Sequence, residues 1–307
     1  MKYVGLQSQI NSNNRKSILL LAGFPAVILG GVYLFYYFLF DGEMEHVNYE
    51  FLIALPFVIG AVGIWFLIAF ASHSALIKFA TKSHTLDRKD NMRVYNLTEN
   101  LCMSMGMKMP QLQVIESDAL NAFASGINEN TYTITLTTGI IDTLDDRELE
   151  GVIAHELMHI RNRDVRLLII SIIFVGIMGF VVQVIFRSMI FGSGRRSRKD
   201  NKVDERVMLI ALAIAVLAYL LTILFKFALS RKREYLADAG AAEMTKNPLG
   251  LASALRKISG NHDLEVRSSD VQQMFIENGP KKNAVGLSGL FSTHPPIGKR
   301  IEFLEQM

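Results

Sequence analysis

Residues 151–174 read "GVIAHELMHIRNRDVRLLIISIIF", a polar motif with two histidines that runs directly into an apolar stretch. Positions four apart lie on one face of a helix, so His155 and His159 can direct two imidazoles at one metal ion. Glu156 lies about 100° further round the helix, where it can reach a water molecule beside that ion. The motif therefore predicts two metal ligands and a general base, as in zinc hydrolases.

An ordinary pair of surface histidines is the alternative explanation of this motif. The residues on both sides are apolar, which indicates that at least one imidazole is buried. Two buried imidazoles with a glutamate between them are difficult to supply with polar partners unless a metal ion is bound, so the metal site is favoured.

The composition of the chain is too apolar for an ordinary soluble protein. It has 307 residues, of which 50% are hydrophobic, and a mean hydropathy of +0.26, which points to a membrane protein. The net charge of +3 gives no reason to expect nucleic-acid binding. Cys102 is the single cysteine, so an internal disulfide and a cysteine-rich metal site are excluded.

Four apolar stretches are each long enough to cross a bilayer, which takes about 20 residues. They cover residues 17–40, 51–71, 167–191 and 207–229. The first is too long for a typical signal peptide and is followed at once by the second, so we expect it to be retained. Buried core helices are the alternative, chiefly for the third and fourth stretches, which contain Gln183, Arg187 and Lys226.

The charges around the first two stretches predict the orientation in the membrane. Three basic residues and no acidic residue precede the first stretch, whereas the loop 41–50 carries four acidic residues and no Lys or Arg. The positive-inside rule places the N-terminus and the segment 72–166 in the cytoplasm and the loop 41–50 outside. The turn 192–206 is basic, so a fully crossing second hairpin would break the rule, and a tilted or shallow hairpin stays open.

These segments predict an α+β protein, mainly helical and integral to the membrane, with about four transmembrane helices and a zincin-like catalytic domain. We expect a transmembrane hairpin over residues 1–72, one part of the catalytic domain over 73–166, a second membrane hairpin over 167–229, and the rest of the catalytic domain over 230–307.

Within the first polar segment, the patterns predict a small sheet between two helices. A helix over residues 72–106 should end at Gly106, and strands are expected over 111–117 and 131–141. The segment 121–127 between them should be a short strand or an extended stretch. A second helix should begin after Asp145, which can form a capping box with Glu148, and run to about Arg163.

A catalytic zinc ion usually takes three protein ligands and leaves one position for water. Glu234 in "SRKREYLADAGAAEM", residues 230–244, can complete a His₂Glu site, although it could instead pair with Arg231 on a solvated face. Asp238, one turn further on, can accept a hydrogen bond from a ligand imidazole. Arg231 could keep these carboxylates ionised or bind substrate carbonyl groups. The role of Asp164 stays open.

Several motifs together resemble the HtpX-type membrane zinc metalloproteases, which are related to the CAAX prenyl proteases. They are "AHELMHIRNRD" (154–164), "SRKREYLADAGAAEM" (230–244), "ESDALNAFASG" (116–126) with "ITLTTGIIDTL" (134–144), and "FSTHPPIGKRIEFL" (291–304). The first sixteen residues match no motif of the family. The resemblance implies a gluzincin-like domain with one zinc ion on His155, His159 and Glu234. It also implies proteolysis of membrane proteins, especially misfolded ones, on the cytoplasmic side of the cell (inner) membrane.

Two further parts of the site are expected to handle the substrate. An extended polypeptide can bind as an added strand, and "NAFASG" is the candidate edge, with the Asn121 amide and the backbone of Ala122, Phe123 and Ala124. Whether this segment is an edge strand or an inner strand stays open. His294 could stabilise the developing oxyanion or could simply precede the prolines that start a final helix.

The main hypothesis is thus a membrane-bound zinc endopeptidase acting on membrane proteins or unfolded polypeptides. The alternative is a non-catalytic membrane scaffold with a structural zinc site, against which Glu156 argues, since a structural site needs no base. A transporter has little support, because the apolar stretches contain few charges. The sequence does not indicate an oligomeric state.

Overall fold

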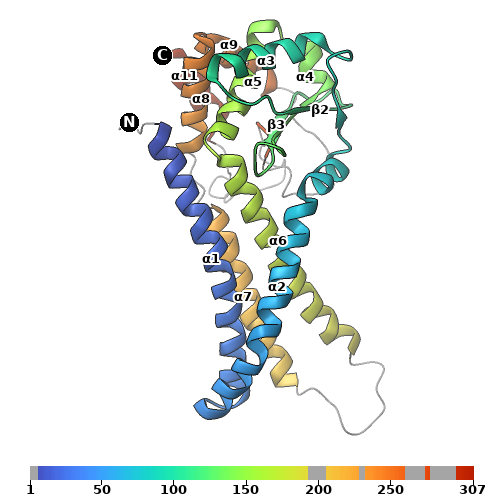
Figure 1. Cartoon of the computed structure of the whole chain (residues 1–307), viewed down its shortest axis with the longest axis vertical. Coiled ribbons are helices and arrows are strands. Elements are labelled where there is room, and N and C mark those ends of the chain that lie inside the picture. The colour runs from blue at the N-terminus through green and yellow to red at the C-terminus, as the bar shows by residue number, and fades with distance from the viewer. Residues whose placement is uncertain (1–5, 193–204, 228–231, 260–273, 277–294) are drawn as a thin grey trace. The chain divides into compact units, whose positions relative to one another are not determined.

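The computed structural model describes residues 6–192, 205–227, 232–259, 274–276 and 295–307 of the chain (Figure 1). The contacts divide the chain into two compact units. A polar unit comprises Met1–Arg15, Ser72–Ile169 and Leu229–Met307, and an apolar unit comprises Lys16–Ala71 and Ile170–Ala228.

The apolar unit is built from four helices that run through the predicted membrane stretches. These helices are α1 (Leu6–Leu39), α2 (Met44–Thr81), α6 (Asp164–Gly192) and α7 (Glu205–Phe227). Three segments are long and apolar enough to cross a membrane, namely Asn11–Leu39, Met44–Thr81 and Asp164–Arg187, and the apolar part of α7 among the described residues is the shorter Val207–Leu221. Stacked rings of Phe24 and Phe174, 4.0 Å apart, lie in the core of the unit. The prediction of a helical membrane protein is confirmed.

The polar unit contains a four-stranded mixed sheet. Its strands are β1 (His84–Thr85), β2 (Gln111–Ile115), β3 (Ala122–Ser125) and β4 (Thr133–Thr137). Their spatial order is β1-β2-β4-β3, with β2 and β4 parallel and the other two pairs antiparallel. Strand β3 therefore lies at one end of the sheet formed by the described residues, and it pairs with β4 alone within that sheet.

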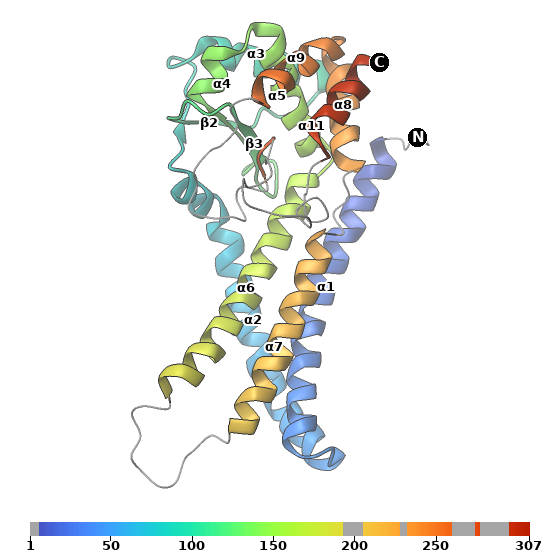
Figure 2. The ribbon, with the colours of Figure 1, turned by 180° about the vertical axis from the view of Figure 1, so that it is seen from behind.

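The remaining helices of the polar unit lie in the same part of the structure as α5 (Asp146–Arg161) (Figure 2). They are α3 (Met92–Met105), α4 (Thr138–Thr143), α8 (Lys232–Thr245), α9 (Pro248–Ile258) and α11 (Ile297–Glu305). Helix α5 packs against α3, α8, α9 and β3. A Cβ atom on Gly151 would come within 3.0 Å of the Leu251 backbone, so the close approach of α5 and α9 requires this glycine.

Local sequence signals predicted the ends of α5 and α3 correctly. The Asp145 side chain accepts the Glu148 N–H, and the Glu148 carboxylate accepts the Asp145 N–H, both at 2.9 Å. This capping box starts α5 as expected. Gly106, with φ of 60°, ends α3 in the left-handed conformation.

Two predicted elements were wrong in extent. The helix expected over residues 72–106 is interrupted: α2 ends at Thr81, and α3 starts after Asn91, whose side chain accepts the Val94 N–H at 3.0 Å. The strand expected over 131–141 ends at Thr137, because the Thr137 hydroxyl caps α4 at the Ile140 N–H. In both places a side chain that caps a helix overrides the periodic pattern.

Candidate metal centre

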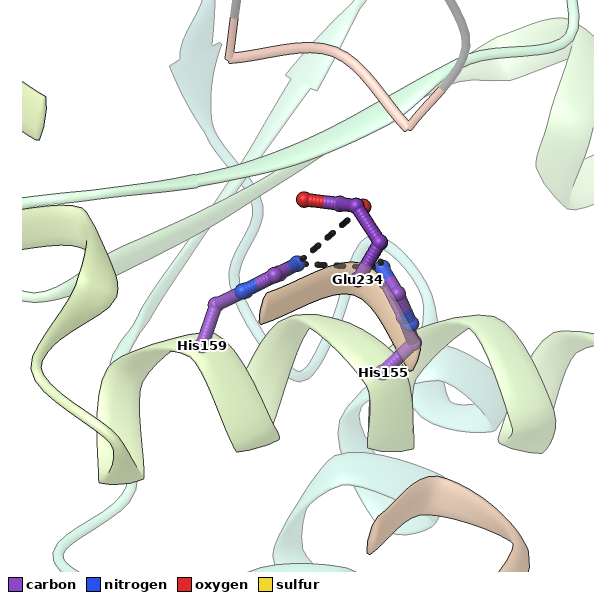
Figure 3. A group of neighbouring side chains, drawn as sticks. All are labelled: His155, His159 and Glu234. Atoms are coloured by element: carbon purple, nitrogen blue, oxygen red, sulfur yellow. Dashed lines mark hydrogen bonds and ion pairs between the residues drawn. The ribbon is translucent and has the colours of Figure 1, made fainter. Parts of the chain in front are cut away.

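Three side chains from two helices converge in the polar unit (Figure 3). His155 and His159 project from neighbouring turns of α5, and Glu234 comes from the first turn of α8. The Nε2 atoms of the two histidines are 3.1 Å apart, and each lies 3.7 Å from Glu234 Oε2. His155 and Glu234 are buried, and the His159 side chain is 12% exposed.

These distances fit a tetrahedral metal ion. Two ligand atoms bound to zinc at about 2.0–2.1 Å lie about 3.4 Å apart in a tetrahedron, close to the spacing of the three donor atoms. Two imidazole nitrogens and one carboxylate are also a donor set that zinc uses in hydrolases. The predicted ligands His155, His159 and Glu234 are therefore brought together as a candidate metal-binding triad.

A carboxylate contacts the far nitrogen of each histidine. Asp238 Oδ1 is 2.9 Å from His155 Nδ1, and Asp164 Oδ2 is 3.1 Å from His159 Nδ1. Such contacts fix the orientation and tautomer of an imidazole and leave its Nε2 to face a metal ion. The structure thus places Asp238 where the sequence predicted it, and it gives Asp164 the matching position at the second histidine.

Arg300 is a component of the site that the sequence did not predict. It lies in the first turn of α11 with 0% of its surface exposed. Its Nε and Nη2 donate to the two oxygens of Asp238 at 2.9 and 2.8 Å, and its Nη1 donates to the Ile276 carbonyl at 3.0 Å. Nη2 also lies 3.3 Å from His155 Nε2. Burial alone would raise the pKa of Asp238, but the Arg300 guanidinium and His155 hold it below its ordinary value.

Glu156 is buried beside the triad, and its surroundings shift the pKa of its carboxyl group. Burial raises the pKa of its carboxyl, and the nearby Glu234 charge adds to this, against the opposing effects of the two histidines. Its carboxylate accepts the Ala124 N–H, and its Oε1 has no hydrogen-bond partner among the described residues. A buried carboxyl with a raised pKa is suited to moving a proton.

The pKa of His159 is raised as well, but here the shift favours the charged form of the side chain. Burial disfavours its charged form, but the Glu234 and Asp164 carboxylates outweigh burial and raise the pKa of His159 to about 10. The surroundings of His159 are therefore built to hold a positive charge, which is carried by a proton when no metal ion is bound.

The outer edge of β3, meaning the side facing away from β4, lies next to Glu156. The Thr137 N–H donates to the Asn121 carbonyl at 3.1 Å, so in the antiparallel ladder the backbone groups of Ala122 and Ala124 point outward. The Ala124 N–H reaches Glu156. The Ala122 carbonyl accepts the Ile276 N–H at 2.9 Å.

The predicted edge segment is thus at the end of the described sheet, and residues 274–276 occupy part of its outer edge. The Phe275 and Phe123 rings lie 5.4 Å apart. The Asn121 side-chain oxygen accepts the Ala122 N–H at 2.9 Å, which orients this amide along its own backbone. Arg231 and His294, the other two candidates, lie outside the described residues.

Comparisons with known proteins agree with these observations. Residues 88–307 match the family model described as "Peptidase family M48". The chain is 54% identical to "Protease HtpX homolog" from Bacteroides fragilis (strain YCH46), with 100% of both chains covered. It is 36% identical to "Protease HtpX homolog" from Listeria monocytogenes serotype 4a (strain HCC23), over 98% of this chain and 100% of the relative.

A solved structure shares the fold. The crystal structure of S. mikatae Ste24p matches with a TM-score of 0.50 and 20% sequence identity, over 96% of this chain and 67% of that one. The likeness supports the α+β membrane fold expected from the sequence.

Proposed function

The chain belongs to peptidase family M48 and is an HtpX-type membrane metalloprotease, and from this premise we propose that it is a zinc-dependent endopeptidase acting on membrane proteins. The observation that carries the proposal is the convergence of His155, His159 and Glu234 beside the buried Glu156. These three side chains would hold one zinc ion per chain. Bound there, zinc would polarise the peptide carbonyl and make a water molecule acidic.

Glu156 is the proposed general base and then general acid. Its raised pKa favours accepting a proton from the attacking water, and its position beside β3 favours delivering that proton to the leaving nitrogen. Because the Ala124 N–H holds the carboxylate, Glu156 stays oriented toward the outer edge of β3. Asp238 and Asp164 orient the two ligand imidazoles.

The substrate is proposed to bind as a strand along the outer edge of β3. The outward Ala124 N–H reaches Glu156, so a substrate strand on this edge would bring its peptide bond beside the proposed base. Since the Ile276 N–H occupies the Ala122 carbonyl, a substrate strand must displace Ile276 to use this acceptor. Main-chain pairing recognises a polypeptide with little side-chain specificity, which suits unfolded substrates.

His294 and Arg231 remain candidates for contacts with the substrate. His294 precedes the prolines that lead into α11, the helix that carries Arg300, and is proposed to steady the developing oxyanion. Arg231, close in sequence to Glu234, is proposed to bind a substrate carbonyl. Replacing His294 or Arg231 by alanine should lower the rate of cleavage without lowering the zinc content of the protein.

The cell (inner) membrane, with the site on the cytoplasmic side, is the proposed location. His159 precedes the start of α6 by five residues, and Glu234 follows the end of α7 by seven, so both ligands lie close in sequence to apolar helices. The basic N-terminus and acidic loop 41–50 favour a cytoplasmic site. Misfolded membrane proteins are the proposed substrates, in membrane protein quality control.

The test separates this protease from a scaffold with a structural metal. The full-length protein is purified in detergent, and zinc content and casein cleavage are compared for wild type, Glu156→Gln, Glu234→Ala and Glu243→Gln, an exposed control on α8. Glu156→Gln should keep its zinc and lose at least about 10²-fold in cleavage rate. Glu234→Ala should lose zinc, and the control should behave as wild type.

Full cleavage by Glu156→Gln would contradict the proposed base, and a full zinc content in Glu234→Ala would contradict the third ligand. Substrates are then identified by comparing membrane proteomes of cells that express wild type or Glu156→Gln. Membrane proteins that accumulate only with the variant support the quality-control role. Accumulation restricted to soluble proteins would argue against it.

A further inference from the structure

Asn13, near the start of α1, connects the N-terminal segment to the candidate metal centre. Its amide Nδ2 donates to Asp164 Oδ1 at 2.7 Å, and Asp164 Oδ2 contacts His159 Nδ1 at 3.1 Å. We propose that Asn13 is a positioning residue that holds Asp164 in the orientation required to align His159 on the metal ion. The inference rests on the proposed function, because it adds a residue to the proposed metal site.

The geometry uses both hydrogens of the Asn13 amide. Besides Asp164, Nδ2 donates to the carbonyl of Asn162 at 2.8 Å. Asn162 is the residue that caps the C-terminal end of α5. Asn13 is 0% exposed, and Asp164 and Asn162 are each 2% exposed. One planar amide therefore connects the end of the ligand helix α5 to the first residue of α6, which carries the carboxylate.

The joint between these two helices explains why such a connection is needed. Arg163, between Asn162 and Asp164, has φ of 60°, a left-handed conformation that a non-glycine residue rarely adopts. The orientation of Asp164 relative to His159 depends on this joint, since the two residues lie on different helices. A fixed donor on Asp164 Oδ1 leaves the other oxygen to His159 and keeps the carboxylate from rotating.

The residue type fits the task. A carboxylate at position 13 would repel Asp164, and an alanine would leave a buried carboxylate oxygen without this donor. An asparagine amide supplies two donors in one plane. The contact also agrees with the grouping of Met1–Arg15 in the polar unit and gives a role to a segment that matched no family motif.

The experiment is a double-mutant cycle on zinc affinity, measured by competition with a chromophoric chelator on the full-length protein in detergent. The variants are Asn13→Ala, Asp164→Asn and their combination. Asp164→Asn should weaken zinc binding by about 10–100-fold, and Asn13→Ala by a smaller factor of about 3–10-fold. Because both act through one carboxylate, the double variant should bind zinc no more weakly than Asp164→Asn alone.

Two further variants make the result specific. Asn14→Ala is the matched control, because Asn14 bonds Arg163 at 2.9 Å and not Asp164, and it should bind zinc as wild type. Asn13→Asp keeps the size of the side chain while replacing the donor, and it should weaken zinc binding more than Asn13→Ala. In cleavage assays at saturating zinc, Asn13→Ala should lower kcat and leave KM unchanged.

A wild-type zinc affinity in Asn13→Asp would overturn the proposal. So would a double variant whose loss of zinc affinity equals the product of the losses in Asn13→Ala and Asp164→Asn. An equal loss in Asn14→Ala would also overturn it, since it would indicate general damage to the N-terminal segment. These failures differ from failure of the proposed function, which would appear as no zinc binding by wild type or as full cleavage by Glu156→Gln.

Discussion

The two histidines of the candidate metal centre are oriented by two different kinds of contact. His155 contacts Asp238, and Asp238 accepts two hydrogen bonds from the buried guanidinium of Arg300. His159 rests on Asp164, which is held by one bond from the neutral amide of Asn13. Two bonds from a charged guanidinium to a carboxylate are stronger and more specific in direction than one bond from a neutral amide.

The two sides of the centre therefore differ in how much stability depends on the residue that holds the carboxylate. The Asp238–Arg300 pair is buried and charge-balanced, so loss of either partner leaves an uncompensated charge. Loss of Asn13 leaves a carboxylate that still contacts His159. We therefore expect the His155 side to respond to substitution far more strongly than the His159 side.

Arg300→Ala should produce the largest effect. It leaves the Asp238 carboxylate buried without its cation, which should lower the free energy of unfolding by about 3–5 kcal/mol. Chemical denaturation of the detergent-solubilised protein measures this, with the exposed neighbour Lys299→Ala as control. Adding Asp238→Asn to Arg300→Ala should recover part of the loss. If Arg300→Ala lowered the free energy of unfolding no more than Asn13→Ala does, the proposed difference between the His155 and His159 sides would be contradicted.

The two carboxylates provide a direct comparison of zinc affinity. Asp164→Asn should weaken zinc binding by about 10–100-fold, the usual cost of losing such a partner. Asp238→Asn should weaken it further, because it also leaves the Arg300 charge unpaired beside His155. Chelator competition measures both constants. Equal constants would mean that Arg300 does not distinguish the two sides.

The number of protons released when zinc binds reports on the His159 side of the centre. The pKa of His159 in the metal-free protein is raised to about 10, so the imidazole is charged at pH 7.5 and must lose its proton when zinc binds. Zinc affinity should therefore rise with pH by up to about tenfold per unit while His159 remains protonated. Calorimetry in buffers of different ionisation enthalpy counts the protons. Asp164→Asn should lower the count at pH 7.5.

The same shift affects the stability of the metal-free protein. A raised pKa means that the folded state binds the proton more tightly, so this stabilisation is complete below the ordinary His pKa of about 6.5. It is lost as the pH rises toward about 10. Unfolding of the metal-free protein followed between pH 6 and 9 should show this decline. A flat profile in that range would contradict the charged state of His159.

The smallest effect concerns the substrate edge, which connects to the His155 side through Arg300 and Ile276. Ile276→Pro removes the N–H that occupies the Ala122 carbonyl, so a substrate strand should bind more easily and KM should fall a few-fold. Ile276→Ala keeps the N–H and is the matched control. An unchanged KM in both variants would indicate that substrates do not use this acceptor.

Local spacing accounts for most of what was predicted correctly. The i, i+4 pair His155 and His159, the capping box at Asp145 and the apolar lengths of the spans each depend on residues within one element. Glu234 and Asp238 could be found because one further motif had the same spacing on a second helix. The helix expected over 72–106 failed because a capping side chain at Asn91 restarts the helix there.

Local patterns were enough to predict the membrane class, the α+β fold and the candidate metal-binding triad, because helical periodicity places His155 and His159 on one face of a helix before any packing occurs. The donors that hold Asp238 and Asp164, in contrast, became visible only in the folded chain. Arg300 lies 62 residues from Asp238, and Asn13 lies 151 residues from Asp164. No local spacing relates such pairs, so a single Arg or Asn carries no signal until burial forces each polar group to find a partner.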